Sequence, residues 1–111
     1  MIMAKFIFNY DEFAASMKLI KKMDKREKKK DPHELKVTIK KVNNDECSMN
    51  IPGFVHTLKA EIIGNGSIAI SIKYLLKILP TYVGIKTISI ESISDNESLI
   101  NGSLKVKTDN Y

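Results

Sequence analysis

Few features of the sequence point to secretion, to a membrane or to a metal-stabilised fold. It contains one cysteine, Cys47, which has no second cysteine for an internal disulfide or for a structural zinc site. The longest unbroken apolar run covers residues 1–4, whereas a membrane span needs roughly 20 apolar residues and the core of a secretion signal about 7 to 15. We therefore expect an intracellular, cytoplasmic protein that is not bound to a membrane and whose fold rests on its apolar core.

What the sequence does contain is typical of a single globular domain. Its 111 residues are 43% hydrophobic and 28% charged, which is ordinary for a soluble domain, and a chain of this length has room for one hydrophobic core. We predict one domain that covers residues 1–111.

The net charge of +5 is concentrated in one segment. Between residues 16 and 30 there are eight basic and two acidic residues, whereas the rest of the chain has ten basic and eleven acidic residues. This local excess favours a polyanionic partner such as nucleic acid. The alternative is a solvated face that only keeps the protein soluble. The basic residues of the segment are Lys18, Lys21, Lys22, Lys25, Arg26, Lys28, Lys29 and Lys30.

The N-terminal third predicts a strand followed by a helix. Residues 4–9 are rich in aromatic and branched side chains, and Asn9 with Glu12 three residues later approximates a capping box. The helix is expected over about residues 10–29, because Pro32 then disfavours further helix. At about 100° per residue, an apolar stripe gathers on one side and basic residues on the other. The stripe comprises Phe13, Met17, Ile20 and Met23, and the basic side comprises Lys18, Lys21, Lys22, Lys25, Arg26 and Lys29.

From residue 34 onward, short segments with alternating apolar residues indicate half-buried strands joined by turns. The pair Asn101-Gly102 predicts a tight hairpin turn, because both central positions of a type I′ turn need positive φ. The predicted strands cover about residues 34–40, 47–51, 55–63, 67–70, 85–93, 98–100 and 103–107.

A second helix is expected between these strands. Ser71 can cap it, and it runs through Leu79 because Pro80 then ends it. Its apolar residues and its lysines lie on opposite sides, as in the first helix. The apolar stripe comprises Ile72, Leu75, Leu76 and Leu79, and the lysines are Lys73 and Lys77.

The predicted order is therefore strand, helix, four strands, helix and three strands. Helices separated by runs of strands with short turns imply an α+β domain with a mostly antiparallel sheet and both helices packed on one face. Because the apolar stripes must cover the sheet, the lysine sides of both helices must point outward together. The sequence thus predicts one basic surface built from two helices.

No combination of residues indicates catalysis, a metal site or a cofactor. His56 shares strand parity with apolar residues and is expected at the edge of the core, whereas His33 is expected in an exposed loop. Cys47 lies among apolar residues without a base to activate its thiol. Turn formation explains the acidic clusters at residues 45–46 and 95–97. We expect a protein that is not an enzyme and that has no small-molecule substrate.

A longer pattern spans nearly the whole chain. It leads from a strand into the first helix, and later from a strand directly into the second helix, a further strand and a polar turn. The residues that carry this pattern are 5–6, 11–13, 17–22, 66–79, 85–91 and 95–97. The pattern resembles one repeat of the DNA sliding clamps, the processivity factors of DNA replication of the bacterial β-clamp and proliferating-cell-antigen type. It is a hydrophobic pattern and contains no invariant chemical motif.

The resemblance implies a sliding-clamp-like domain in which strands form an outer shell and the two helices turn their basic sides toward duplex DNA. Such contact is with phosphates and does not read the base sequence. Clamps carry two or three repeats per chain and close a six-repeat ring, whereas this sequence holds one repeat. We therefore expect a homo-oligomer or an association with another clamp subunit. The DNA-binding residues that the resemblance implies are Lys18, Lys21, Lys22, Lys25, Arg26, Lys73 and Lys77.

Two hypotheses about function remain open. The first is a non-catalytic, DNA-associated clamp-type module, and the second is a protein-interaction or structural oligomer module of the same fold with no nucleic-acid role. In the family, partners dock a short peptide in a pocket near a junction between repeats, and the sequence does not place that pocket. A platform that stacks single-stranded bases is not expected, because Phe6, Phe8 and Phe13 fall at core positions away from the lysines.

Overall fold

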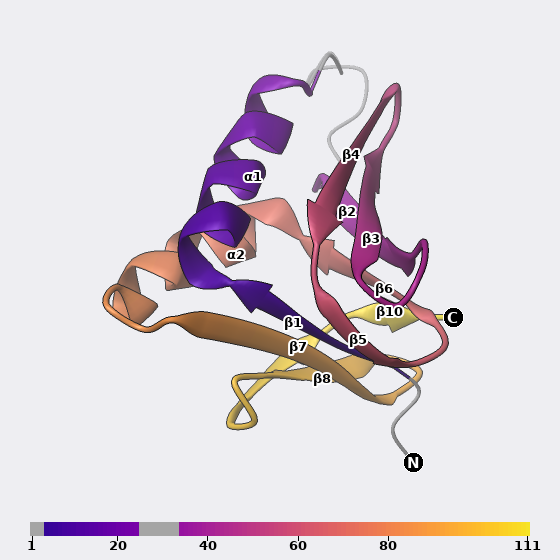
Figure 1. The fold of residues 1–111 in the computed structure, drawn as a ribbon. Helices are drawn as coiled ribbons and strands as arrows, with labels where there is room; N and C mark the ends of the chain where they lie inside the picture. Colours follow the sequence, from indigo (N-terminus) through magenta and orange to yellow (C-terminus); the bar gives the residue numbers. More distant parts are fainter. Residues whose placement is uncertain (1–3, 25–33) are drawn as a thin grey trace.

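The computed structural model describes residues 4–24 and 34–111. Within these ranges two helices pack with two five-stranded sheets, and the strand pairings are antiparallel (Figure 1). This architecture confirms the predicted α+β class. In spatial order the first sheet contains β5 (Glu61–Gly64), β1 (Ala4–Asn9), β7 (Thr87–Ser94), β8 (Glu97–Ile100) and β9 (Leu104–Lys107). The second sheet contains β10 (Asp109–Asn110), β6 (Ser67–Ser71), β2 (Lys36–Lys41), β3 (Glu46–Ile51) and β4 (Phe54–Lys59).

Helix α1 (Tyr10–Lys22) follows β1 without a break. The Oδ1 of Asn9 accepts the N–H of Glu12 at 3.0 Å, which confirms the predicted cap. The expected helix end near residue 29 is wrong, because the N–H of Met23 donates to the C=O of Ile20 at 3.1 Å and closes the last turn. Ile20 is the last fully buried residue of the stripe, and only charged residues lie between Met23 and the following proline. No apolar side chain is therefore available to hold a longer helix against the core.

Helix α2 (Ile72–Ile78) begins where β6 ends. The Oγ of Ser71 accepts the N–H of Tyr74 at 3.1 Å, which confirms the second predicted cap. The α-helix ends before Pro80, as expected, and a 3₁₀ turn, η1 (Leu79–Tyr82), carries the chain through the proline. Neither helix of the described residues is long and apolar enough to cross a membrane.

The single strand expected over residues 55–63 is two strands, β4 and β5, which belong to different sheets. Ala60 lies between them, is buried, and donates its N–H to the C=O of Asp45 at 3.0 Å. Here the chain crosses from the second sheet to the first. Because of this split, five strands rather than four separate the helices. Strand β10 was not predicted either, and with it four strands rather than three follow α2. The expected helix stop at Pro32 and the exposed His33 lie outside the described residues.

One apolar core joins both sheets and both helices. Helix α1 contacts α2, β1, β4 and β7, and α2 contacts β6, so the helices lie next to each other over the same core (Figure 1). The expectation of a single sheet under the helices is wrong, because the core is shared by two sheets. Six of the eight stripe residues are at most 3% exposed, which confirms their predicted place in the core, whereas Met23 and Leu76 are half-buried. The six are Phe13, Met17, Ile20, Ile72, Leu75 and Leu79.

Packing of the α1 stripe can be tested at Met17, which is fully buried. We predict that Met17→Ala lowers the free energy of unfolding by about 2 to 5 kcal/mol, because it removes packed apolar atoms and leaves a cavity. Urea denaturation followed by circular dichroism measures the change. Lys18→Ala, on the exposed side of the same helix, is the matched control and should change the value by less than about 0.5 kcal/mol. Equal effects of the two substitutions would contradict the assigned helix orientation.

Candidate nucleic-acid interface

The candidate site begins with the exposed side of α1. Lys18, Lys21 and Lys22 are exposed, whereas the stripe of the same helix is buried in the core. The first turn of α1 carries Asp11 and Glu12, so the positive charge lies in the C-terminal half of the helix. This placement suits the helix dipole, because acidic groups lie at its positive end and lysines at its negative end.

Helix α2 adds two lysines to this surface. Lys73 and Lys77 are exposed and one helical turn apart, while Ile72 and Leu75 are fully buried. The first turn of α2 contains no acidic residue. We call the exposed lysines of the two neighbouring helices the helix-pair face. It comprises Lys18, Lys21, Lys22, Lys73 and Lys77.

The structure describes only part of the basic segment recognised in the sequence. Two residues expected at the DNA interface, Lys25 and Arg26, lie outside the described residues, as do Lys28, Lys29 and Lys30. Three of the eight basic residues of segment 16–30 are therefore placed, all of them on α1. The placed lysines are consistent with the predicted two-helix basic surface, but their contact with DNA stays a prediction.

The two helices are joined at the start of α1. The hydroxyl of Tyr10 donates to the C=O of Leu79, and the backbone N–H of Tyr10 donates to the C=O of Lys86 at 3.0 Å. Beside this junction lies a hollow of about 140 Å³ that we call the interhelical groove. Because residues of both helices line it, the groove shows that Lys18 faces the α2 side of the helix pair. Its lining comprises Tyr10, Ala14, Lys18, Leu76, Leu79, Pro80 and Val83.

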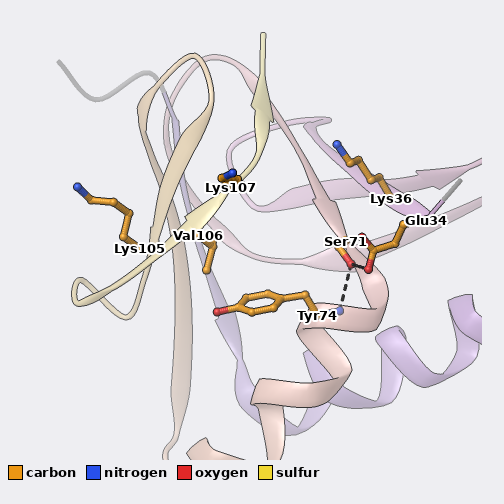
Figure 2. A pocket seen from close by; sticks show the side chains of 7 residues that line it. All are labelled: Glu34, Lys36, Ser71, Tyr74, Lys105, Val106 and Lys107. Atoms are coloured by element: carbon orange, nitrogen blue, oxygen red, sulfur yellow. Dashed lines mark hydrogen bonds between the residues drawn. The ribbon is translucent and has the colours of Figure 1, made fainter.

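A larger hollow of about 500 Å³ lies where the start of α2 approaches β9 (Figure 2). We call it the Tyr74 groove. The Tyr74 side chain extends from α2 toward β9, where Val106 is buried and the neighbouring lysines are exposed (Figure 2). The sequence does not predict this site, because its parts come from segments far apart in the chain. The lining residues are Glu34, Lys36, Ser71, Tyr74, Lys105, Val106 and Lys107.

Hydrogen bonds fix one wall of the Tyr74 groove. The Oγ of Ser71, which caps α2, also donates to a carboxylate oxygen of Glu34 at 2.5 Å. The Nζ of Lys36 lies 2.6 Å from Oδ2 of Asp109, and this hydrogen bond raises the pKa of Lys36 above its ordinary value. The groove therefore combines an aromatic and aliphatic floor with lysine ammonium groups at its rim, and two of its charged residues, Glu34 and Lys36, are engaged with Ser71 and Asp109 respectively.

Neither His56 nor Cys47 has an environment that indicates catalysis. The Nε2 of His56 lies 3.1 Å from the Oγ of Ser16 on α1, and its ring stacks on Phe54 with centroids 6.5 Å apart. This half-buried position confirms the predicted place at the core edge. Cys47 is fully buried, and burial raises the pKa of its thiol to about 12. In residues 4–24 and 34–111 no three histidine, cysteine or acidic side chains gather closely enough to hold a metal ion.

Two neighbouring helices over the shared core of two antiparallel sheets define a sliding-clamp-like fold, which confirms the predicted resemblance. The fold is similar to the crystal structure of the DNA polymerase III beta subunit of Thermotoga maritima, with a TM-score of 0.66 and 16% sequence identity. The match covers 98% of this chain and 29% of that chain, so this chain spans less than a third of the length of that protein. No protein-family model matches the sequence, and no curated protein matches it.

Burial of the Cys47 thiol makes the free energy of unfolding change with pH in the alkaline range. Its pKa is about 12 in the folded protein against an ordinary 9.0, so between these values the unfolded chain binds fewer protons and stability falls as pH rises. We predict that wild type loses about 1 kcal/mol relative to Cys47→Ala between pH 8 and pH 10. Urea denaturation of both proteins at each pH measures this loss. The comparison with Cys47→Ala removes the effect of lysine titration, because both proteins contain the same lysines. A pH-independent difference would contradict the raised pKa.

Proposed function

We propose that residues 1–111 form one non-catalytic, clamp-type module that associates with duplex DNA in the cytoplasm. The observation that carries this proposal is the helix-pair face, in which two neighbouring helices of a clamp-like fold expose five described lysines. The contacts are made by Lys18, Lys21, Lys22, Lys73 and Lys77, together with Lys25 and Arg26 outside the described residues.

The chemistry of this face is suited to phosphates. A lysine ammonium is a point charge on a flexible stem, so it neutralises a phosphate without requiring a particular base. The large aromatic side chains near α1 are unavailable for base stacking, since Phe6, Phe8 and Phe13 are at most 1% exposed. Binding is therefore nonspecific, and a single copy has a dissociation constant on the order of 10⁻⁴ to 10⁻⁶ M at physiological salt.

The DNA contact can be tested by charge reversal. We predict that Lys18→Glu, Lys22→Glu and Lys77→Glu together abolish binding to a duplex, because all three side chains are exposed on the helix-pair face and bury little. Wild-type affinity should fall by about 0.9 log units per log unit of salt for each phosphate neutralised. Fluorescence anisotropy with a labelled duplex across a salt series measures both effects.

A charge-matched variant makes this experiment specific. Lys40, Lys59 and Lys105 are exposed on strands and are not part of the helix-pair face, and reversing all three gives the same net charge as the helix variant. The strand variant should retain most of the binding. Absence of wild-type binding at low salt, or equal losses in the two variants, would contradict DNA contact by the helix-pair face. Circular dichroism of both variants verifies that the fold is intact.

Assembly is the second part of the proposal. A single module cannot surround DNA, whereas β4 and β9 are edge strands of the two sheets that the described residues form, and they offer backbone groups for pairing with a neighbouring copy. Six copies of the 12.6 kDa chain would form a ring of roughly 75 kDa. Association with another clamp subunit is the alternative route to a closed ring.

Light scattering tests self-assembly. We predict a concentration-dependent shift from the 12.6 kDa chain toward a homo-oligomer, with roughly 75 kDa as the limit for six copies. Val55→Pro, on the exposed edge strand β4, should reduce association because proline removes a backbone N–H that an added strand needs. A proline in the internal strand β2, such as Lys40→Pro, would disturb the sheet itself and is not a suitable control. Wild type measured with a duplex present serves as the comparison. A monomer at high concentration would exclude the self-assembled ring.

The second candidate function is a protein-interaction module of clamp-like fold without a nucleic-acid role. The observation that favours it is the Tyr74 groove, whose size lies within the range of roughly 300 to 1,000 Å³ seen for ligand pockets. Its half-buried Tyr74 and its exposed lysines suit a peptide that carries an apolar side chain and acidic groups. If the charge-reversal experiment contradicts DNA contact, the protein-interaction function becomes the better supported of the two.

A further inference from the structure

The helix-pair face is not uniformly polar. The interhelical groove opens beside Lys18 of this face, and apart from Lys18 the groove is lined by apolar groups and the ring of Tyr10. Ala14 and Leu76 approach from the two helices, and Val83 stands beside them with 74% of its surface exposed. A phosphate backbone held by the lysines would place charged oxygens over this hollow. Duplex DNA therefore does not explain the apolar lining.

The size of the interhelical groove sets what it can hold. Its volume of about 140 Å³ is close to that of the ~150 Å³ apolar cavity known to bind one benzene molecule. One leucine, methionine or phenylalanine side chain has this size. The groove is thus suited to a single apolar anchor and is too small for a folded apolar surface.

The charges around the groove select the rest of the ligand. Lys18 lies in the lining itself, Lys22 follows it one turn later on α1, and Lys73 and Lys77 are the neighbours of Leu76 on α2. Asp11 is an acidic residue on that side of α1, two turns before Lys18. The lysines outnumber this one acidic residue, so the net flanking charge is positive on both helices. A segment with carboxylates on both sides of its apolar anchor complements it.

We propose that the interhelical groove binds an acidic protein segment that inserts one large apolar side chain between α1 and α2. The carboxylates of the segment lie beside Lys18, Lys22, Lys73 and Lys77, and the anchor contacts Ala14, Leu76 and Val83. This interaction does not require that the protein binds DNA. Where it does bind DNA, the acidic segment competes for the same lysines, so the two ligands exclude each other.

The experiment uses three short synthetic peptides and the full chain. In the first peptide a central leucine is flanked on each side by three glutamates, in the second alanine replaces the leucine, and in the third lysines replace the glutamates. We expect the leucine peptide to bind about tenfold more tightly than the alanine peptide, because the anchor loses contact with water. The lysine peptide should not bind. Fluorescence anisotropy at about 50 mM salt measures all three affinities.

Uncharged substitutions separate the groove from the lysines. Ala14→Leu fills the groove and should remove the preference for leucine over alanine, while binding of the alanine peptide is unchanged. Val83→Ser should reduce the preference without a cost to folding, because Val83 is largely exposed. Val55→Ser, at a valine of 61% exposure on β4, is the matched control and should keep the full preference. Duplex binding should be unaffected in all three variants.

Several outcomes would overturn the proposal. Absence of leucine-peptide binding, equal binding of the leucine and alanine peptides, or a leucine preference that survives Ala14→Leu would each show that the groove takes no anchor. Self-association that disappears in Ala14→Leu would identify a second copy of the chain as the occupant instead. A protein that binds the leucine peptide as expected but fails to bind DNA would contradict the proposed DNA contact and leave this inference intact.

Discussion

Burial of the two helix stripes in one apolar core decides where the charges of the protein can lie. Phe13 and Met17 of α1 and Leu75 of α2 are fully buried, so the remaining sides of both helices must face solvent. A lysine in the core without a partner would be too costly to retain. The core therefore forces an exposed polar face on the helix pair. It does not require that this face be positive, because glutamates would satisfy the same constraint, so the excess of lysine is a separate observation that supports an anionic partner.

The same core explains how the chain connects two sheets. Leu58 and Ala60, which are two residues apart, are both buried, and Ala60 marks the crossing from β4 to β5. The crossing joins the edge strand β4 of the second sheet to the edge strand β5 of the first, whose opposite edge is β9. Lys59 on β4 and Lys105 on β9 are exposed. Charged side chains on an edge strand disfavour indiscriminate pairing. An assembly through these edges would therefore need a neighbour that matches the lysines, which favours specific association over aggregation.

Local periodicity was sufficient to predict the features that depend on nearby residues. The caps at Asn9 and Ser71, the buried stripes and the hairpin turn belong to this group, and Asn101 and Gly102 do have positive φ angles of 52° and 73°. The errors have two different causes. The early end of α1 has a local cause, because no apolar residue lies between Met23 and Pro32, and helical spacing of the lysines alone overestimated the length of the helix. The split at Ala60 is non-local, because it depends on a hydrogen bond to Asp45 that no local pattern contains.

The candidate sites divide in the same way. The lysines of the helix-pair face follow from helical spacing, whereas the two grooves do not, because each combines residues from separate elements. Tyr74 and Val106 line the same hollow only because the fold brings the start of α2 near β9, and Val83 lies beside Ala14 only because Tyr10 ties the start of α1 to the end of α2. Burial alternates along residues 104–107, with Val106 inward, but a strand pattern does not specify which helix lies nearest to it.

Salt distinguishes the two kinds of contact that the helix-pair face offers. At physiological ionic strength the screening length is about 8 Å, so each exposed lysine acts mainly on groups that are already close to it. Contact of an apolar side chain with Ala14 and Leu76 is not weakened by such screening. A ligand held by lysines alone therefore depends on many simultaneous contacts, which one module with five described lysines supplies only in part. A ligand with an apolar anchor retains one contribution that salt does not remove, and the proposed exchange of a polyanion for a protein segment on one small surface rests on this difference.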